Sequence, residues 1–204
     1  MSELPTVFIV DDDPAVQRAV GIVARSLSCE VRMFGSASEF LLGYAEGTAG
    51  CLVLDVRMPE MSGIELQKML VDAGVRLPVI MMSGHADIPM AVTAMSQGAF
   101  TFLQKPFRMP ELTSAIEQAV QQSLAEQKLH QKQTEVLARL KSLTSKEREV
   151  LDLLLEGRSN KEIAFHLSIS LRAVEDRRAR LMKRMEAASI VELVSDVRSL
   201  PVGN

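Results

Sequence analysis

The 204-residue sequence predicts a doubly wound α/β domain with a five-stranded parallel sheet, then a long helix, then a small all-α domain. Three observations support this prediction. Apolar runs of strand length alternate with helix-like segments over residues 6–124, a helical stretch without Gly or Pro follows, and residues 143–199 contain only helix patterns. Strands that alternate with helices form parallel sheets, because each helix carries the chain back across one face of the sheet.

The first strand, Thr6–Val10, is largely apolar and rich in β-branched residues, which is typical of a strand buried on both faces. Asp13 and Pro14 follow as the cap and the first position of a helix. Capping boxes with a Glu three residues later predict two further helix starts, at Ser36 and Ser62. The other expected elements of this domain are strands at Val31–Phe34, Cys51–Leu54, within Val75–Met82 and at Phe100–Leu103, and a helix over Ile88–Gln97.

Polar residues stand where the predicted strands end. Asp11 and Asp12 follow the first strand, Asp55 the third, Ser83 the fourth, and Lys105 comes soon after the fifth. Ligands bind outside the carboxyl ends of parallel strands, so we expect these side chains in one crevice. Clustered carboxylates repel one another unless a cation neutralises them, and oxygen ligands without His or Cys favour Mg²⁺. A lysine and a hydroxyl can hold a phosphoryl group, with a carboxylate as its nucleophilic acceptor.

Four stretches at these positions resemble the marks of response-regulator receiver domains: Phe8–Asp12, Leu52–Pro59, Ser83–His85 and Leu103–Phe107. The resemblance covers residues 4–124 and implies a flavodoxin-like fold. It also implies that a sensor histidine kinase transfers a phosphoryl group from its phosphohistidine to Asp55.

The same resemblance implies roles for the residues around the phosphoacceptor. Ser83 and Lys105 contact the phosphoryl oxygens, and Phe102 is the aromatic of a switch that follows the movement of Ser83. Pro106 matches a cis proline of the family. The chain is not expected to be an enzyme, since it is expected to catalyse at most its own slow dephosphorylation. The groups implied to hold Mg²⁺ are Asp11, Asp12, Asp55 and the backbone carbonyl of Arg57.

The segment Glu111–Leu143 contains neither Gly nor Pro, and its apolar residues recur broadly at helical spacing. We predict one long helix that packs on the first domain until about Ser123. At about 1.5 Å per residue, roughly 30 residues span about 45 Å. The alternative is a helix that frays into a solvated linker around Gln121–Gln133. A coiled-coil seam has little support, because the apolar spacing slips between Leu124 and Val136.

The C-terminal part has the pattern of a helix-turn-helix. Capping boxes at Thr144–Glu147 and Ser159–Glu162 begin two helices, and a turn at Ser168–Ser170 leads to a helix from Leu171 to about Met185. Residues 125–204 have 15 basic and 12 acidic side chains, whereas residues 1–124 have 8 basic and 14 acidic ones. The helix from Leu171 to about Met185 is itself basic, which favours a nucleic acid as its partner.

Three stretches resemble the four-helix DNA-binding domain of the LuxR type: Leu143–Leu151, Gly157–Ala164 and Ser170–Glu175. With the receiver, they resemble the FixJ-like (NarL-like) response regulators. The family usually has Thr in place of Ala173 and His in place of Arg177. Glu175 and Asp176 are expected to read bases, because a carboxylate accepts a hydrogen bond from cytosine and repels phosphate. The residues expected to grip the DNA backbone are Lys161, Arg172, Arg177, Arg178, Arg180 and Lys183.

These observations predict a phosphorylation-switched transcription factor with a receiver (1–124), a helical linker (125–142) and a DNA-binding domain (143–204). Phosphorylation is expected to favour a homodimer, through residues 88–97 and the strand with Phe102, that binds double-stranded promoter DNA. One alternative is an aspartyl-phosphate phosphatase, but such enzymes have a second Asp where this chain has Arg57. The other is a DNA-binding protein whose receiver does not respond to phosphate.

The composition bears on the class of protein. Hydrophobic residues make up 47% of the chain and charged residues 24%, which argues against disorder. No apolar run approaches the roughly 18 residues of a membrane span, and no secretory signal pattern is present. Cys29 and Cys51 form no CxxC site and are expected to be reduced. We therefore expect a cytoplasmic protein with no membrane partner.

Overall fold

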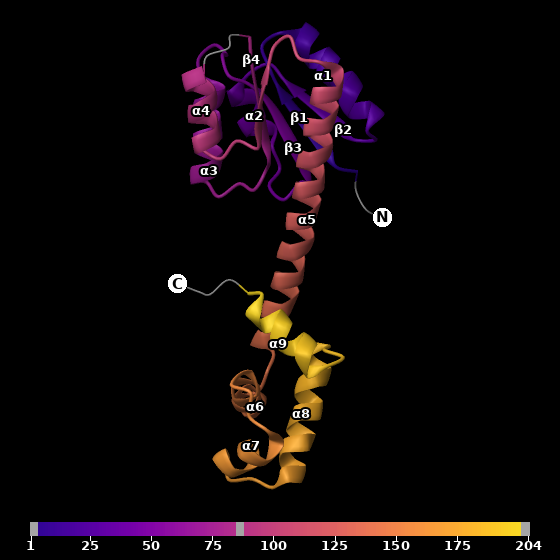
Figure 1. The fold of residues 1–204 in the computed structure, drawn as a ribbon, viewed down its shortest axis with the longest axis vertical. Helices are drawn as coiled ribbons and strands as arrows, with labels where there is room; N and C mark the ends of the chain where they lie inside the picture. Colours follow the sequence, from indigo (N-terminus) through magenta and orange to yellow (C-terminus); the bar gives the residue numbers. More distant parts are fainter. Residues whose placement is uncertain (1–3, 85–87, 201–204) are drawn as a thin grey trace. The chain divides into compact units, whose positions relative to one another are not determined.

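The computed structural model describes residues 4–84 and 88–200. The chain divides into two compact units, Met1–Gln127 and Lys128–Asn204. Among the described helices, none combines the length and the apolar character that crossing a membrane requires. Figure 1 shows the sheet and its covering helices in the first unit, and helices in the second.

The first unit contains a parallel sheet in the order β2-β1-β3-β4-β5, the predicted doubly wound arrangement. Every residue of β1, β3 and β4 is buried, as the continuous apolar runs indicated. The predicted fold class is therefore confirmed for this unit. The strands are β1 (Thr6–Val10), β2 (Glu30–Phe34), β3 (Gly50–Asp55), β4 (Val79–Ser83) and β5 (Thr101–Gln104).

Helices cover both faces of the sheet. Alternate residues of β1 divide between the two cores: Val7 and Ile9 pack with α1 and α5, whereas Phe8 and Val10 pack with α2, α3 and α4. The two layers are visible on either side of the sheet in Figure 1. The helices are α1 (Pro14–Ser26), α2 (Ala37–Gly43), α3 (Gly63–Asp72), α4 (Ile88–Ser96) and α5 (Met109–Lys141).

Local signals fix where these helices begin. Asp13 caps α1, with Pro14 at its first position, and Ser62 forms the predicted capping box of α3. The capping box predicted at Ser36 is wrong in one half. Ser36 does accept the N–H of Glu39, but the Glu39 carboxylate accepts the N–H of Gly35, one residue before the cap, at 2.7 Å. The backbone before α2 turns so that this earlier N–H faces the carboxylate.

A glycine allows α3 to begin directly against the end of β3. A Cβ on Gly63 would lie 2.1 Å from the carbonyl oxygen of Asp55, so any larger residue would push the strand end and the helix start apart. The N–H of Gly63 also donates to the carbonyl of Val56 at 3.0 Å. This contact fixes the backbone that carries Asp55.

The long helix α5 confirms the predicted continuous helix over the connection, in place of one that frays. Its N-terminal half packs in the first unit, where Leu112 and Ile116 are fully buried. The hydroxyl of Ser123 accepts the N–H of Gly50 at 3.0 Å in the same unit. Its C-terminal part, with Val136 and Leu140, belongs to the core of the second unit. The connection is thus a structural helix of both units.

The second unit contains four further helices, as predicted, and their core also includes Val136 and Leu140 at the end of α5. Its core includes the buried side chains of Val150, Ile163, Val174, Leu181 and Leu193. The predicted capping boxes at Thr144 and Ser159 are both complete. The order of α7, a short turn and α8 is that of the predicted helix-turn-helix. The helices are α6 (Ser145–Leu155), α7 (Asn160–His166), α8 (Leu171–Met185) and α9 (Ile190–Arg198).

Candidate functional site

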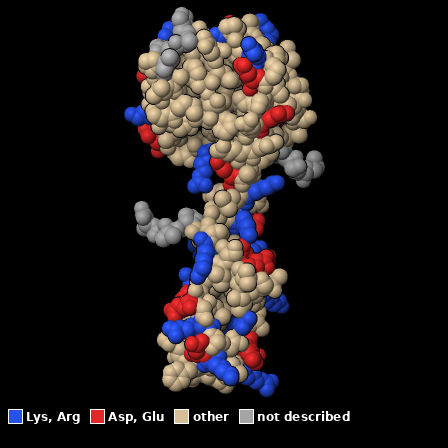
Figure 2. Space-filling view, viewed as in Figure 1, with Lys and Arg blue, Asp and Glu red and all other residues tan. Residues whose placement is uncertain are grey.

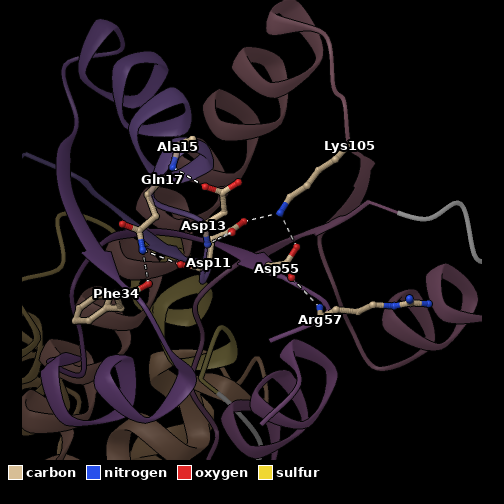
Figure 3. Close-up of polar contacts among 8 residues, drawn as sticks. All are labelled: Asp11, Asp13, Ala15, Gln17, Phe34, Asp55, Arg57 and Lys105. Carbon is tan, nitrogen blue, oxygen red and sulfur yellow. Dashed lines mark hydrogen bonds and ion pairs between the residues drawn. The ribbon is translucent and has the colours of Figure 1, made fainter. Parts of the chain in front are cut away.

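Three side chains from distant parts of the chain meet at the carboxyl ends of the strands. The ammonium of Lys105 donates to Oδ2 of Asp11 and to Oδ1 of Asp55, both at 2.6 Å. The two carboxylate side chains are only 1% and 7% exposed. Figure 3 shows the lysine reaching between them. The sequence therefore placed these three residues together correctly.

The acidic turn after β1 holds Asp11 in place. Its Oδ1 accepts the N–H of Asp13 at 2.9 Å, and Asp13 in turn caps the N–H of Ala15 at 2.7 Å. Burial raises the pKa of Asp11, although hydrogen bonds from Lys105 and Asp13 oppose this rise. A buried carboxyl whose pKa is raised gains from a nearby cation. Asp12, in contrast, is exposed.

Both oxygens of Asp55 are engaged. Oδ1 accepts from Lys105, and Oδ2 accepts the backbone N–H of Arg57 at 2.8 Å. The Arg57 side chain is exposed and points away from the carboxylates in Figure 3. The backbone of this loop, more than the guanidinium, therefore orients the carboxylate.

Burial acts to lower the pKa of Lys105, but the hydrogen bonds and charges of Asp11 and Asp55 outweigh it, so the pKa is raised. The lysine is therefore an ammonium that neutralises part of the carboxylate charge. Its backbone N–H donates to the carbonyl of Ser83 at 2.7 Å, which joins β4 and β5 at the site. The following peptide, Lys105–Pro106, is cis as predicted.

Ser83 is buried at the end of β4, and Phe102 is half-buried in the middle of β5. Phe102 stands beside Met81 in the strand register and packs in the core shared with α2, α3 and α4. His85, which belongs to one of the resembling stretches, lies outside the described residues.

Among the described residues, no three Asp, Glu, His or Cys side chains lie close enough together to hold a metal ion. Asp11 and Asp55 are brought together by Lys105, whereas exposed Asp12 is not drawn in with them. The donors still have the chemistry that a hard divalent cation requires. They are the carboxylate oxygens of Asp11 and Asp55, in a place where burial disfavours uncompensated negative charge.

One polar residue at this site was missed by the sequence analysis. Gln17 of α1 donates through Nε2 to the carbonyl oxygens of Asp11 at 2.7 Å and Phe34 at 2.9 Å. A glutamine inside an amphipathic helix carries no sequence signal for such a contact, because its partners are backbone atoms, one at the end of β2 and one just after β1.

In the second unit, α8 has one buried and one exposed side. Val174, Leu181 and Met185 are buried at spacings of about two turns and one turn. The predicted DNA-contacting residues that are exposed on this helix and on α7 are Lys161, Arg172, Glu175, Asp176, Arg180 and Lys183.

Two of the predicted backbone-gripping arginines are instead half-buried and engaged inside the unit. Arg177 lies 3.6 Å from the carboxylate of Glu149 on α6. Arg178 donates to the side-chain oxygen of Asn160, the first residue of α7, at 2.9 Å. These contacts orient α8 on the two preceding helices. The sequence contained the charges but not the pairing, since helical spacing does not say which neighbour each arginine faces.

A third internal contact joins α8 to the start of α6. Buried Glu147 accepts from the backbone and hydroxyl of Thr144 at 2.9 and 2.8 Å, and it pairs with Arg184 at 3.3 Å. The hydrogen bond from the Thr144 backbone, followed by the Thr144 hydroxyl and the charge of Arg184, lowers the pKa of Glu147 against the effect of burial.

Comparison with known families and proteins covers both units. Residues 7–117 match the response regulator receiver domain, and residues 141–197 match the bacterial regulatory proteins of the luxR family. The response regulator protein TmoT of Ectopseudomonas mendocina is 42% identical over 188 residues, which are 92% of this chain and 86% of TmoT. The transcriptional regulatory protein FixJ of Rhizobium meliloti is 40% identical over 189 residues, 93% of each chain.

Solved structures give the same result. The response regulator StyR has a TM-score of 0.85 and 40% identity, with 96% of this chain and 99% of StyR covered. Full-length FixJ from B. japonicum has a TM-score of 0.58 and 37% identity, with both chains fully covered.

Proposed function

Since the chain belongs to the response regulators in which a receiver domain precedes a LuxR-type DNA-binding domain, we propose that Asp55 is the phosphoacceptor that controls its binding to promoter DNA. The observation that supports this assignment is the buried Asp11–Lys105–Asp55 arrangement at the carboxyl end of the sheet. The proposed donor is the phosphohistidine of a sensor histidine kinase, and the proposed compartment is the cytoplasm.

In the proposed reaction an oxygen of Asp55 bonds to phosphorus while the P–N bond of the phosphohistidine breaks, and the imidazole leaves with a proton from solvent. In the structure, the ammonium of Lys105 donates a hydrogen bond to Oδ1 of Asp55. In the reaction it donates to a phosphoryl oxygen, where negative charge accumulates. The N–H of Arg57 holds Oδ2 and so aims the other oxygen at the incoming group.

The residues proposed to hold Mg²⁺ are Asp11, Asp12, Asp55 and the backbone carbonyl of Arg57. The ion would supply positive charge next to the phosphoryl oxygens. Within the chain itself, Lys105 performs the corresponding neutralisation of Asp11 and Asp55.

The proposed switch links this chemistry to the face of the sheet near β5. A phosphoryl group adds oxygens that attract Ser83, which is buried at the end of β4. Movement of Ser83 gives Phe102, two strand positions away on the neighbouring strand, space to turn inward. The surface of α4 and β5 would then join a second copy, because Val92 and Met95 on α4 are exposed apolar side chains.

In the DNA complex, the proposed phosphate contacts come from Lys161, Arg172, Arg177, Arg178, Arg180 and Lys183. Although Arg177 and Arg178 have internal partners, a guanidinium has five N–H donors and can serve a phosphate as well. Glu175 and Asp176 are exposed on α8 and are proposed to contact base edges. A dimer would place two α8 helices on half-sites one helical turn apart.

The test uses the full chain with acetyl phosphate and Mg²⁺, followed by gel electrophoresis that retards phosphoproteins. The wild type is expected to acquire one phosphoryl group and to sediment as a dimer, and Asp55→Asn is expected to do neither. Equal labelling of the variant would disprove the assignment of Asp55.

Selection of bound genomic DNA fragments, with and without beryllofluoride as phosphoryl mimic, tests the link between the units. Enrichment of a two-fold symmetric site only with the mimic supports the proposal. Equal enrichment in both conditions would support DNA binding by the second unit but contradict its control by phosphorylation.

A further inference from the structure

A residue without charge holds the backbone of the acidic turn. Gln17 donates through its one amide nitrogen to the carbonyls of Asp11 and Phe34, at 2.7 and 2.9 Å. Phe34 ends β2 and Asp11 is the residue after the end of β1, on the neighbouring strand, and Figure 3 shows the amide directed at both carbonyls. The N–H of Asp11 also donates to the Phe34 carbonyl, at 3.2 Å. Both polar backbone groups of Asp11 are therefore fixed.

The carbonyl that Gln17 holds belongs to the peptide between Asp11 and Asp12. Its direction sets the plane of that peptide and hence the direction in which Asp12 leaves the strand. Asp11 has its own support from Lys105 and Asp13, whereas exposed Asp12 has no side-chain hydrogen bond or ion pair to the residues that the structure describes. The orientation of Asp12 therefore depends on its backbone.

We infer that Gln17 is a positioning residue for a divalent cation, which orients the Asp11–Asp12 peptide so that both carboxylates can face one ion. The inference rests on the proposed function, because it assumes that this turn binds the ion. Replacing a residue that orients the ligands of a metal typically lowers the metal affinity by about 10- to 100-fold.

Gln17→Met is the sharpest variant, because its side chain has the same length and places a methyl group where Nε2 stands. It removes the donor without a charge change. With Mn²⁺ as the probe and free Mn²⁺ measured by electron paramagnetic resonance, the dissociation constant of the full chain is expected to rise about tenfold. Gln118→Met is the matched control, since the Gln118 amide donates to the hydroxyl of Ser114 on the same exposed helix face.

A second readout separates positioning from a general loss of structure. With acetyl phosphate, the Mg²⁺ concentration that gives half the maximal phosphorylation rate should rise by a similar factor in Gln17→Met. The rate at saturating Mg²⁺ should stay near that of the wild type. If Gln17→Met does not fold, Gln17→Asn serves instead, because its amide falls about 1.5 Å short of the two carbonyls.

Asp11→Asn distinguishes failure of the role of Gln17 from failure of the proposed ion site. Loss of tight Mn²⁺ binding in Asp11→Asn with unchanged binding in Gln17→Met would overturn the role of Gln17 alone. Unchanged binding in Asp11→Asn would show that the ion binds elsewhere, which overturns the proposed ion site and this inference together. Weaker binding in both, with Gln118→Met unchanged, supports the inference.

Discussion

The two units build their polar sites in opposite ways. In the first, Asp11, Asp55 and Lys105 come from three distant segments and hold one another in a buried position. In the second, the proposed DNA contacts lie mostly on the exposed side of one helix, α8. Figure 2 shows the same contrast, with few charged side chains on the visible face of the first unit and many on that of the second.

This difference teaches where single substitutions do damage. A buried charge that loses its partner remains buried and uncompensated, so one change disturbs the whole group. An exposed charge is already solvated, so its loss removes one contact and little else. A single substitution in the first site should therefore lower stability strongly. In the second site, several residues should each contribute a small part of the DNA affinity.

The largest effect is expected for Lys105→Met, which leaves two carboxylates of 1% and 7% exposure without their cation. In the absence of Mg²⁺ at pH 7, we expect the free energy of unfolding of the first unit to fall by about 3 kcal/mol. Urea unfolding followed by the fluorescence of Tyr44, the one tyrosine in a chain without tryptophan, reports on this unit. Lys68→Met on exposed α3 surface is the control. Equal stability of Lys105→Met and the wild type would contradict the contrast between the units.

Glu147→Gln tests one of the two buried carboxylates in the described part of the second unit, the other being Asp196. Its pKa is lowered in the folded state, so its charge stabilises the fold above the pKa of the unfolded state, about 4.3, and this contribution is lost as the pH falls through the lower folded value. At pH 7 the variant should lose about 1 kcal/mol, and the difference should vanish in acid.

Hydrogen exchange of the α6 and α8 amides at several pH values measures this loss. Asp152→Asn, an exposed residue of α6 with a long ion pair to Arg148 at 3.7 Å, should change stability by less than about 0.5 kcal/mol. A deficit of Glu147→Gln that stayed constant down to pH 3 would rule out the charge as its cause.

Arg172→Ala and Arg184→Ala compare two exposed cations of α8, of which Arg184 is engaged inside the unit. Arg184 donates to the carbonyl of Ser142 at 2.9 Å and pairs with Glu147. Arg172→Ala should weaken DNA binding by about 1 kcal/mol and reduce the salt slope by about 0.9, with stability unchanged. Arg184→Ala should lower stability and leave the slope nearly intact. The opposite assignment of the two effects would show that the contacts of Arg184 give way to DNA.

The smallest effect is expected for Gln67→Met, a buried polar residue of the first unit that carries no charge. Its Nε2 donates to the carbonyls of Ala94 and Gln97 at the end of α4, at 3.2 and 3.3 Å. Its Oε1 has no hydrogen-bond partner among the described residues. The variant loses two weak bonds and one unsatisfied acceptor, so the free energy of unfolding should change by less than about 0.5 kcal/mol. A loss as large as that of Lys105→Met would mean that burial of any polar group, rather than of charge, makes this unit sensitive.

Much of the first site was predictable because its residues stand at strand ends. Strand length, β-branched content and helix caps can each be recognised from a few neighbouring residues. Parallel strands then bring their carboxyl ends to one edge of the sheet. That reasoning places Asp11, Asp55, Ser83 and Lys105 at the same edge of the sheet. It did not find Gln17, because its partners are backbone oxygens, one at the end of β2 and one just after β1, and no residue type marks such atoms.

The sequence by itself determined the order and kind of the elements: the alternating first unit, the uninterrupted α5 and the helix-turn-helix, each through signals within one or two helical turns. Tertiary structure alone decided the pairings, namely that Lys105 bridges Asp11 and Asp55 and that Arg177 and Arg178 face Glu149 and Asn160. It also decided that the end of α5 completes the core of the second unit. The physical reason is range, because local propensity acts between neighbours in sequence, whereas pairing depends on which side chains packing brings within hydrogen-bond distance.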